Sequence, residues 1–246
     1  MTLENSSKVK KMGCSYVLYD DRLISEMNLQ LFDADYLANN GSHTDSIGSS
    51  DAGIGRARVV YFIHNNITMV LKHYYRGGIV SALIKDRYFG FNIEKTRSFR
   101  EWYLLKKMRS LDLPVPNAVA ARVKKGLFFY QADLITQKIE NTKTLSDVLS
   151  EEDLNSEQWG RIGACIKLFH QKNIYHADLN ARNILLDQEG EVYLIDFDNS
   201  SIRKDDASWK MSNLTRLKRS LNKFKKNERN FYFDEQSWSD LVRGYQ

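Results

Sequence analysis

Cysteine, proline and long apolar runs are all scarce in this sequence. It has 2 cysteines and 2 prolines in 246 residues, and two thiols, Cys14 and Cys165, are too few for the disulfide framework of a small secreted protein. No run of about eighteen apolar residues is present to form a transmembrane helix, and residues 1–8 lack the apolar stretch of a secretory signal. These absences predict a folded protein of a reducing cytoplasm that neither spans a membrane nor is exported.

The remaining composition is that of a globular protein with excess positive charge. Hydrophobic residues make up 42% of the chain, which is enough for real cores, and 246 residues hold either one bilobal unit or two small domains. The net charge of +5 indicates an anionic partner. It does not distinguish a nucleotide from a nucleic acid or a lipid headgroup.

Three polar residues stand at offsets typical of phosphoryl transfer. Asp178 lies in the segment His-Ala-Asp-Leu-Asn-Ala-Arg-Asn, Asn183 follows it by 5 positions, and Asp196 follows Asn183 by 13. These offsets match the H-R-D-x-x-x-x-N and D-F-G motifs of protein-kinase-like enzymes. In that pattern the first carboxylate takes the acceptor hydroxyl's proton, and the amide oxygen and second carboxylate hold magnesium. We therefore expect Asp178 to be catalytic and Asn183 and Asp196 to bind the metal.

The chain between Asn183 and Asp196 has the pattern of a hairpin. Apolar residues at 184–186 and 192–195 flank a polar turn that Gly190 closes. A hairpin carries its two ends to the same place, so Asn183 and Asp196 would face one metal ion. Each motif alone is common and means little; the combination makes the prediction specific.

The segment before the loop is predicted to be a helix. Trp159, Ile162, Ile166 and Phe169 recur at helical spacing, and Cys165 on the same stretch is expected to be a buried free thiol. His170 is expected to pack or cap at the helix end, and His176 to shape the loop by hydrogen bonds to the backbone.

Residues earlier in the chain have the pattern of a nucleotide-binding lobe. Gly53 and Gly55 precede an apolar run at 59–63, and after a polar turn a second strand at 67–72 ends in Lys72. In kinases a glycine loop covers the phosphates and a strand lysine contacts them. Two glycines are a weak signal, and a strand lysine usually meets solvent. Their position ahead of the loop motif favours the nucleotide-binding role.

Lys72 requires a carboxylate partner, because an ammonium in a partly dry cleft is costly alone. Apolar residues at helical intervals indicate a helix that contains Glu101, with Ser98 as a possible N-cap. Glu101 is the expected partner. Glu94, which precedes the cap, is the alternative, and an exposed helix carboxylate is the other interpretation of Glu101.

Further strands follow this helix. Pro114 and Pro116 end it, because a residue before proline is disfavoured in the helical conformation. Apolar patterning then predicts strands at 119–123, 127–130 and 134–139, the first two joined as a hairpin.

The order of these elements predicts an α+β, bilobal protein-kinase-like fold. An antiparallel-sheet lobe with one main helix would occupy residues 1–140, and a small, mainly helical catalytic lobe would occupy residues 141–246. The backbone at Glu140 would be the hinge that meets the adenine. The polar, glycine- and serine-rich stretch at about 38–52 is predicted to be a flexible insert.

Several segments together resemble a narrower group. From about Phe32 to Lys223 the chain resembles the bacterial 3-deoxy-D-manno-octulosonic acid (Kdo) kinase family, which is related to the lipopolysaccharide heptose kinases. The segments that carry the resemblance are 74–78 (YYRGG), 85–89 (KDRYF), 96–101 (TRSFRE), 113–116 (LPVP), 130–136 (YQADLIT), 175–181 (YHADLNA) and 194–198 (LIDFD).

The resemblance implies an ATP- and Mg²⁺-dependent kinase in lipopolysaccharide inner-core biosynthesis. It would phosphorylate the 4-hydroxyl of Kdo on a Kdo-lipid A precursor, as a peripheral protein at the cytoplasmic face of the bacterial inner membrane. Asp198 replaces the last glycine of the D-F-G motif, so the usual flip of that loop is not assumed.

The residues themselves also favour a small acceptor. Asn180 stands where serine/threonine protein kinases carry lysine, and no A-P-E motif follows. Basic residues interleaved with aromatic ones lie between Lys72 and Glu101, and such residues grip carboxylates and phosphates. We expect four of them to bind substrate, although each is as consistent with a solvated basic loop: Arg76, Lys85, Arg87 and Arg97.

Other functions compete with this one. A heptose kinase or another small-molecule kinase of the same fold is the alternative enzyme. A catalytically dead scaffold would lack a catalytic residue, and the sequence has all of them. A nucleic-acid-binding protein would show salt-dependent binding of RNA or DNA without ATP turnover, and no nucleic-acid partner is expected.

A basic amphipathic helix is predicted near the end of the chain. Apolar residues at intervals of three or four would line one face: Met211, Leu214, Leu217, Leu221 and Phe224. Six basic residues would occupy the rest and face an anionic membrane surface: Arg216, Lys218, Arg219, Lys223, Lys225 and Lys226. The other interpretation is that the apolar stripe packs on the helical lobe and the basic face is only solvated.

Overall fold

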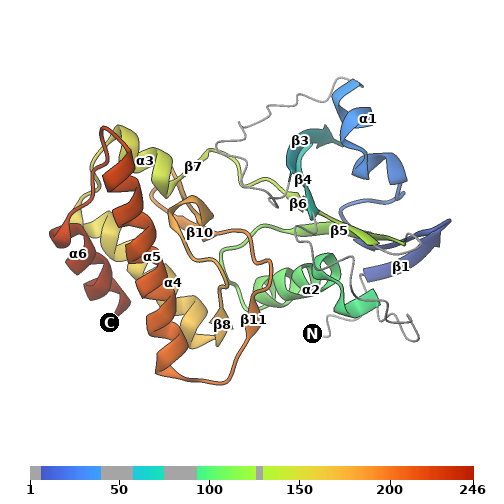
Figure 1. Ribbon diagram of the computed structural model, residues 1–246. Coiled ribbons are helices and arrows are strands. Elements are labelled where there is room, and N and C mark those ends of the chain that lie inside the picture. Colours follow the sequence, from blue (N-terminus) through green and yellow to red (C-terminus); the bar gives the residue numbers. More distant parts are fainter. Residues whose placement is uncertain (1–6, 40–57, 75–92, 126–129) are drawn as a thin grey trace, which may run out of the picture. The chain divides into compact units, whose positions relative to one another are not determined.

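The computed structural model describes residues 7–39, 58–74, 93–125 and 130–246, which form two compact units (Figure 1). Unit 1 comprises residues 1–106 and 117–138, and unit 2 comprises residues 107–116 and 139–246. The segment 107–116 thus belongs to the second unit, although it precedes two strands of the first.

Unit 1 contains a six-stranded antiparallel sheet. Its strands lie in the order β1-β2-β5-β6-β4-β3. They are β1 Ser7–Met12, β2 Ser15–Asp20, β3 Arg58–His64, β4 Ile67–Tyr74, β5 Ala118–Lys125 and β6 Tyr130–Gln137. The sheet and one main helix confirm the predicted α+β class with an antiparallel N-terminal sheet.

Helices cover the two faces of this sheet (Figure 1). On one face, α1 Ala34–Asn39 and the 3-10 helix η2 Leu29–Phe32 pack on alternate strand residues such as Phe62, Met69 and Leu71, all at most 1% exposed. The long helix α2 Arg97–Arg109, preceded by the 3-10 turn η4 Ile93–Lys95, lies on the other face. The predicted insert at 38–52 begins inside α1, and its remainder lies outside the described residues.

The β3–β4 hairpin has the tight turn that the sequence indicated. His64 pairs with Ile67, and the two residues between them, Asn65 and Asn66, have φ angles of 51° and 61°. Two successive positive φ angles are those of a type I′ turn, whose twist matches that of antiparallel strands and which asparagine tolerates. This turn fixes the register that places Lys72 opposite Val59.

The predicted break between a strand at 127–130 and another at 134–139 was wrong, and residues 127–129 lie outside the described residues. Residues Tyr130–Gln137 form the single strand β6, paired with β5 along its length. Asp133, which falls between the two predicted strands, is only 1% exposed. Arg122 Nε donates to it over 2.6 Å, and His73 Nδ1 is its second partner. Because the carboxylate is bonded on both sides, it is accommodated inside the sheet.

The prediction that Ser98 caps α2 was also wrong. The helix begins at Arg97, and the carbonyl of Thr96 accepts the first helical bond from Arg100 N, which makes Thr96 the capping position. Ser98 lies within the first turn, fully buried, and its hydroxyl donates to the Arg122 carbonyl over 3.1 Å. The serine therefore ties α2 to β5.

Unit 2 is mainly helical. Its helices are α3 Leu145–Glu151, α4 Ser156–Gln171, α5 Ala207–Asn227 and α6 Glu235–Tyr245. Short strands form two small sheets: β10-β9-β7, from β7 Thr142–Thr144, β9 Ile184–Asp187 and β10 Val192–Leu194, and β11-β8, from β8 Ile174–Tyr175 and β11 Ser201–Ile202. The predicted hairpin is therefore confirmed as β9 and β10, and Gly190 in its turn has φ 78°.

Helix α4 is the centre of this unit. Trp159, Ile162, Ile166 and Phe169 are all at most 2% exposed, as their helical spacing predicted. Against it packs α6, so closely that a Cβ atom added at Gly163 would overlap the backbone of Leu241. Cys165 is buried as expected, and burial raises the pKa of its thiol to about 12.

The amphipathic prediction for α5 holds for part of the helix. Leu214, Leu217 and Leu221 are buried, but Met211 is 56% exposed, so it does not belong to the buried stripe. Lys218, expected on a free basic face, pairs with Glu235 of α6 over 2.7 Å. Among the described residues, no helix combines the length and hydropathy that a membrane crossing requires.

Candidate active site

The loop between α4 and β9 is shaped by His176. Its imidazole is 3% exposed; Nε2 donates to the Ile195 carbonyl over 2.9 Å, and Nδ1 accepts from the Asp178 amide over 3.1 Å. The ring therefore joins the loop to the end of the β9–β10 hairpin. This confirms the expected structural role of His176, and it leaves the Asp178 side chain outside this network.

Asparagine side chains hold the backbone at Asp178. The Asp178 carbonyl accepts from Asn180 Nδ2 over 3.0 Å and from Asn183 Nδ2 over 2.9 Å. Asn183 is 8% exposed and lies in the 3-10 turn η5 Ala181–Asn183. Because its amide nitrogen is engaged as a donor, its amide oxygen is the atom available to a cation. The Asp178 carboxylate, in contrast, is 62% exposed.

Asp196 follows β10, and the backbone next to it is hydrogen-bonded to the loop that contains Asn183. The Ile195 amide donates to the Asn183 carbonyl over 3.1 Å, which continues the β9–β10 pairing by one residue. Asp196 is exposed and has φ 62°, a conformation that costs a non-glycine residue about 1 kcal/mol or more. Its neighbour Phe197 is 1% exposed and lies 4.7 Å from the His176 ring between centroids. A buried aromatic anchor thus holds Asp196 outward despite the strain.

The donor set of this loop fits magnesium. Mg²⁺ prefers oxygen ligands and is usually held by one or two carboxylates together with substrate phosphates. The Asn183 amide oxygen and the Asp196 carboxylate supply two such oxygens from residues at the paired ends of one hairpin. The side-chain chemistry therefore agrees with the metal-binding prediction.

In unit 1, Lys72 and Glu101 form the predicted pair. Lys72 Nζ lies 3.1 Å from Glu101 Oε2 and 3.3 Å from Oε1. Glu101 is 4% exposed and also accepts a short hydrogen bond from the Tyr74 hydroxyl. The Lys72 ammonium lies 4.7 Å from the centroid of the Tyr74 ring. Strand β4 and helix α2 thus fix one cation against a buried carboxylate.

Only two of the remaining predicted site residues, Arg97 and Glu140, lie within the described ranges. The Arg97 guanidinium, at the start of α2, lies over the Tyr74 ring at 5.2 Å. Glu140 is exposed in the turn before β7. Five predicted residues lie outside the described ranges: Gly53, Gly55, Arg76, Lys85 and Arg87.

Comparison with known proteins identifies the family. The lipopolysaccharide kinase (Kdo/WaaP) family matches residues 49–245, a range that contains every predicted site residue. The chain belongs to this family. Similar proteins named 3-deoxy-D-manno-octulosonic acid kinase occur in Haemophilus influenzae strain 86-028NP (43% identical over 204 residues, 78% of this chain and 84% of the relative) and in Vibrio vulnificus strain YJ016 (37% over 238 residues, 96% and 97%).

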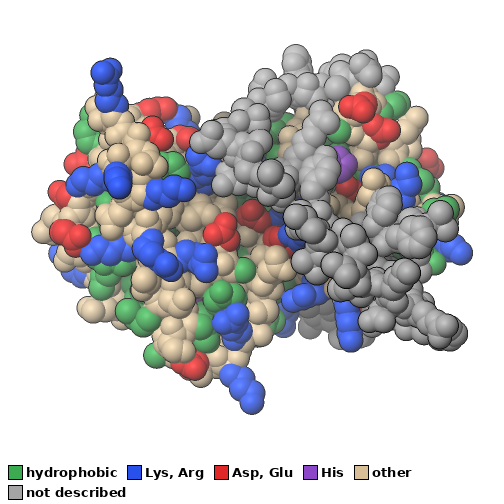
Figure 2. All heavy atoms as spheres, in the orientation of Figure 1, with side chains coloured by type: hydrophobic (Ala, Val, Ile, Leu, Met, Phe, Trp, Pro, Cys, Tyr) green, Lys and Arg blue, Asp and Glu red, His purple; other side chains and the backbone are tan. Residues whose placement is uncertain are grey.

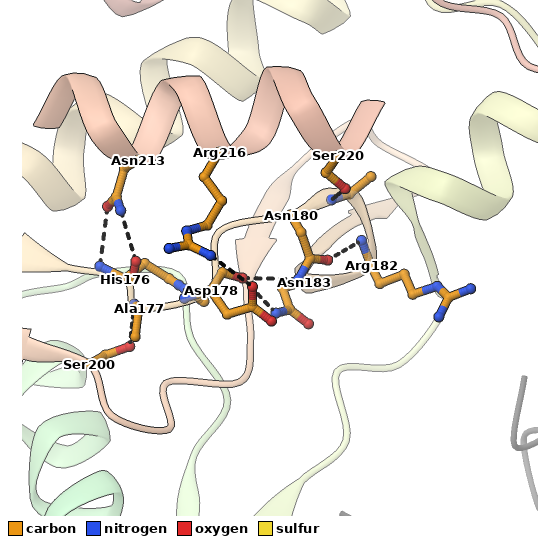
Figure 3. A network of polar contacts seen from close by, with 11 residues as sticks. His176, Ala177, Asp178, Asn180, Arg182, Asn183, Ser200, Asn213, Arg216 and Ser220 are labelled. Carbon is orange, nitrogen blue, oxygen red and sulfur yellow. Dashed lines mark hydrogen bonds and ion pairs between the residues drawn. The ribbon is translucent and has the colours of Figure 1, made fainter. Parts of the chain in front are cut away.

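In this lipopolysaccharide kinase chain, sequence reasoning missed the contribution of α5 to the loop (Figure 3). Asn213 is fully buried; its Nδ2 donates to the His176 carbonyl over 2.8 Å, and its Oδ1 accepts from the His176 amide over 3.2 Å. Ser220 accepts from the Ala181 amide over 3.3 Å. The sequence contains a signal for a buried polar residue here, because Asn213 shares the four-residue spacing of Leu217 and Leu221 and is the polar member of that stripe.

His170 supports Asn213 from α4. Its Nε2 lies 3.3 Å from Asn213 Oδ1, and its Nδ1 lies 2.8 Å from the Tyr245 hydroxyl. Since Asn213 Oδ1 can only accept, Nε2 carries the proton and Nδ1 accepts from the tyrosine. Burial lowers the pKa of His170 to about 4. The expectation that His170 packs at the end of α4 is confirmed.

Proposed function

We propose that the chain is an ATP-dependent kinase that phosphorylates the 4-hydroxyl of Kdo on a Kdo-lipid A precursor in lipopolysaccharide inner-core biosynthesis. One observation carries the proposal: a single loop and hairpin hold an exposed carboxylate, Asp178, beside two oxygen donors, Asn183 and Asp196. The family match supplies the class of reaction, and relatives of similar length are named for the acceptor.

In the proposed mechanism Asp178 acts on the acceptor. Its exposed carboxylate accepts the proton of the sugar hydroxyl as that oxygen attacks the terminal phosphate of ATP. Asn183 and Asp196 would hold Mg²⁺, which, when bound, would neutralise charge on the phosphate oxygens. Lys72 contacts the nucleotide phosphates, and Glu101 keeps its ammonium in place. His176 and the two asparagines at the Asp178 carbonyl keep the loop in one conformation.

The same proposal assigns roles to the other predicted residues. The fold would be the bilobal protein-kinase-like one, with Gly53 and Gly55 over the phosphates and the backbone at Glu140 against adenine. Arg97 carries a cation next to the Tyr74 ring, in a position to receive an anionic group. It would bind the anionic acceptor together with Arg76, Lys85 and Arg87.

Mass spectrometry of the acceptor after incubation with ATP and magnesium tests this function. A Kdo-lipid A precursor should gain one phosphate, whereas the same lipid without Kdo and a heptose acceptor should not. Asp178→Asn should lower turnover by roughly a hundred to ten thousand fold without unfolding the protein. Asp153→Asn, which changes an exposed aspartate outside the loop, is the matched control. Phosphorylation of heptose instead, or an active Asp178→Asn variant, would refute the assignment.

We further propose peripheral binding to anionic membranes at the cytoplasmic face of the inner membrane. Figure 2 shows lysine and arginine side chains gathered over the part of unit 2 that α5 occupies in Figure 1. Arg219, Lys223, Lys225 and Lys226 on this helix are exposed. Each basic residue near an anionic surface contributes about 1 kcal/mol, and the attraction falls with salt.

Vesicle sedimentation tests the membrane proposal. Replacing three exposed basic residues of α5 by glutamine should weaken binding to anionic vesicles about a hundredfold at low salt and leave ATP binding intact: Arg219, Lys225 and Lys226. The matched control removes the same charge from exposed lysines of unit 1: Lys10, Lys11 and Lys124. Equal weakening by both triple variants would mean that only net charge matters, and binding indifferent to salt would exclude the proposal.

A further inference from the structure

An arginine that none of the kinase motifs contains lies beside the proposed catalytic carboxylate. Arg216 projects from α5 toward Asp178 (Figure 3), and its Nη1 lies 3.8 Å from Asp178 Oδ1. The helix is fixed to the loop on both sides of it, by Asn213 at His176 and by Ser220 at Ala181. The packing of α5 therefore holds the backbone of Arg216 next to the loop independently of the ion pair, within reach of Asp178.

This ion pair contributes little to stability. A separation of 3.8 Å exceeds hydrogen-bond distance, and the side chains of Arg216 and Asp178 are 41% and 62% exposed. Exposed pairs of this kind contribute from nothing to about 1 kcal/mol. In addition, Arg216 Nε is buried and forms no hydrogen bond with any described residue. An arginine that contributes little to stability and leaves a buried polar nitrogen without a hydrogen bond is better explained by ligand binding than by folding.

We infer that Arg216 binds the carboxylate of the acceptor sugar and so selects a sugar acid over a neutral sugar. This inference rests on the function proposed above. In Kdo the carboxylate is attached to the ring carbon two bonds from the carbon that carries the 4-hydroxyl. A sugar whose hydroxyl meets Asp178 therefore brings its carboxylate near a guanidinium beside Asp178, and arginine binds carboxylates in a bidentate manner.

The neighbouring arginine does not offer the same geometry. The Arg182 guanidinium lies over the Phe224 ring at 5.2 Å, and its backbone amide donates to Asn180 Oδ1. Arg216 thus differs from Arg182 in having its ion pair with the reacting carboxylate itself. When the acceptor binds, the guanidinium exchanges a loose contact with Asp178 for the sugar carboxylate and leaves Asp178 to the hydroxyl.

The test measures kcat/KM for two enzymes, each with two acceptors. The acceptors are a Kdo-lipid A precursor and the same compound with the Kdo carboxylate reduced to a primary alcohol; the enzymes are wild type and Arg216→Gln. Wild type should lose about 10- to 100-fold in kcat/KM on the reduced acceptor, mainly through KM, the size of one charge-assisted hydrogen-bonded contact. Arg216→Gln should lose a similar factor on the native acceptor and little more on the reduced one.

Two further variants make the result specific. Arg216→Lys keeps the charge without the bidentate fork, and it should retain part of the preference for the native acceptor. Arg229→Gln removes an exposed guanidinium just beyond α5, and it should behave as wild type with both acceptors. An unchanged KM for ATP in every variant shows that each protein is folded and binds nucleotide.

The outcomes separate this inference from the proposed function. If wild type phosphorylates both acceptors equally well, the inference is overturned and the kinase assignment stands. If Arg216→Gln loses the same kcat factor on both acceptors, Arg216 acts on the transferred phosphate, which also overturns it. If wild type phosphorylates neither acceptor while it turns over another sugar, the proposed function fails, and the inference fails with it.

Discussion

The stability of this protein should depend on pH through His170. The side chain is 3% exposed and contacts α5 through Asn213 and α6 through Tyr245. Burial is the main reason that its pKa falls from 6.5 to about 4; the nearby charge of Lys210 and the electrostatic influence of His176 lower this pKa further, while the hydrogen bond with Asn213 opposes the shift.

The magnitude follows from this shift. In the unfolded chain His170 takes up a proton below about pH 6.5, but in the folded protein it does so only below about pH 4. Between these values the unfolded state binds more protons, so the free energy of unfolding falls as the pH falls. At about 1.4 kcal/mol per pKa unit, the stabilisation from the neutral imidazole is complete above about pH 6.5. Roughly 3 kcal/mol of it is lost by about pH 4.

Urea unfolding of wild type and His170→Gln between pH 4 and pH 8 measures this effect. Glutamine keeps polar atoms at the site but does not titrate, so the stability difference between the two proteins should shift by roughly 3 kcal/mol in favour of the variant as the pH falls. Leu221→Ala, which truncates a fully buried side chain of α5, should be destabilised by about 2–5 kcal/mol at every pH. Parallel curves for wild type and His170→Gln would refute the argument.

Three further predictions concern the site and the thiols. Asp196→Ala should abolish the dependence of ATP affinity on magnesium, and isothermal titration with and without magnesium should then give equal affinities; a retained difference contradicts the metal role. Lys72→Met should cost roughly 3 kcal/mol of stability, because it leaves Glu101 buried without its cation. The double variant with Glu101→Gln should regain stability without activity, which denaturation and turnover assays compare. A thiol reagent at pH 8 should label exposed Cys14 but not Cys165, whose pKa burial raises to about 12; mass spectrometry that finds both labelled in the folded protein contradicts this burial.

Local patterns in the sequence were sufficient for the elements that carry the site. The apolar spacing of Trp159 to Phe169 predicted α4, and a polar stretch between two apolar runs predicted the turn of the β3–β4 hairpin. The hairpin between Asn183 and Asp196 followed from two apolar runs on either side of a polar turn that Gly190 closes. These signals depend on residues a few positions apart, so periodicity and turn chemistry determine them.

Contacts between distant segments were decided only by the tertiary structure. Asp133 falls between two predicted strands, and the sheet accommodates it because Arg122 and His73 bond its carboxylate. In the sequence Asn213 is one polar residue of an amphipathic helix. Only the structure shows that its side chain bonds the backbone of His176, 37 positions away. A buried polar group is tolerated only where partners meet it, and partners so distant along the chain are brought together by packing, which no local pattern encodes.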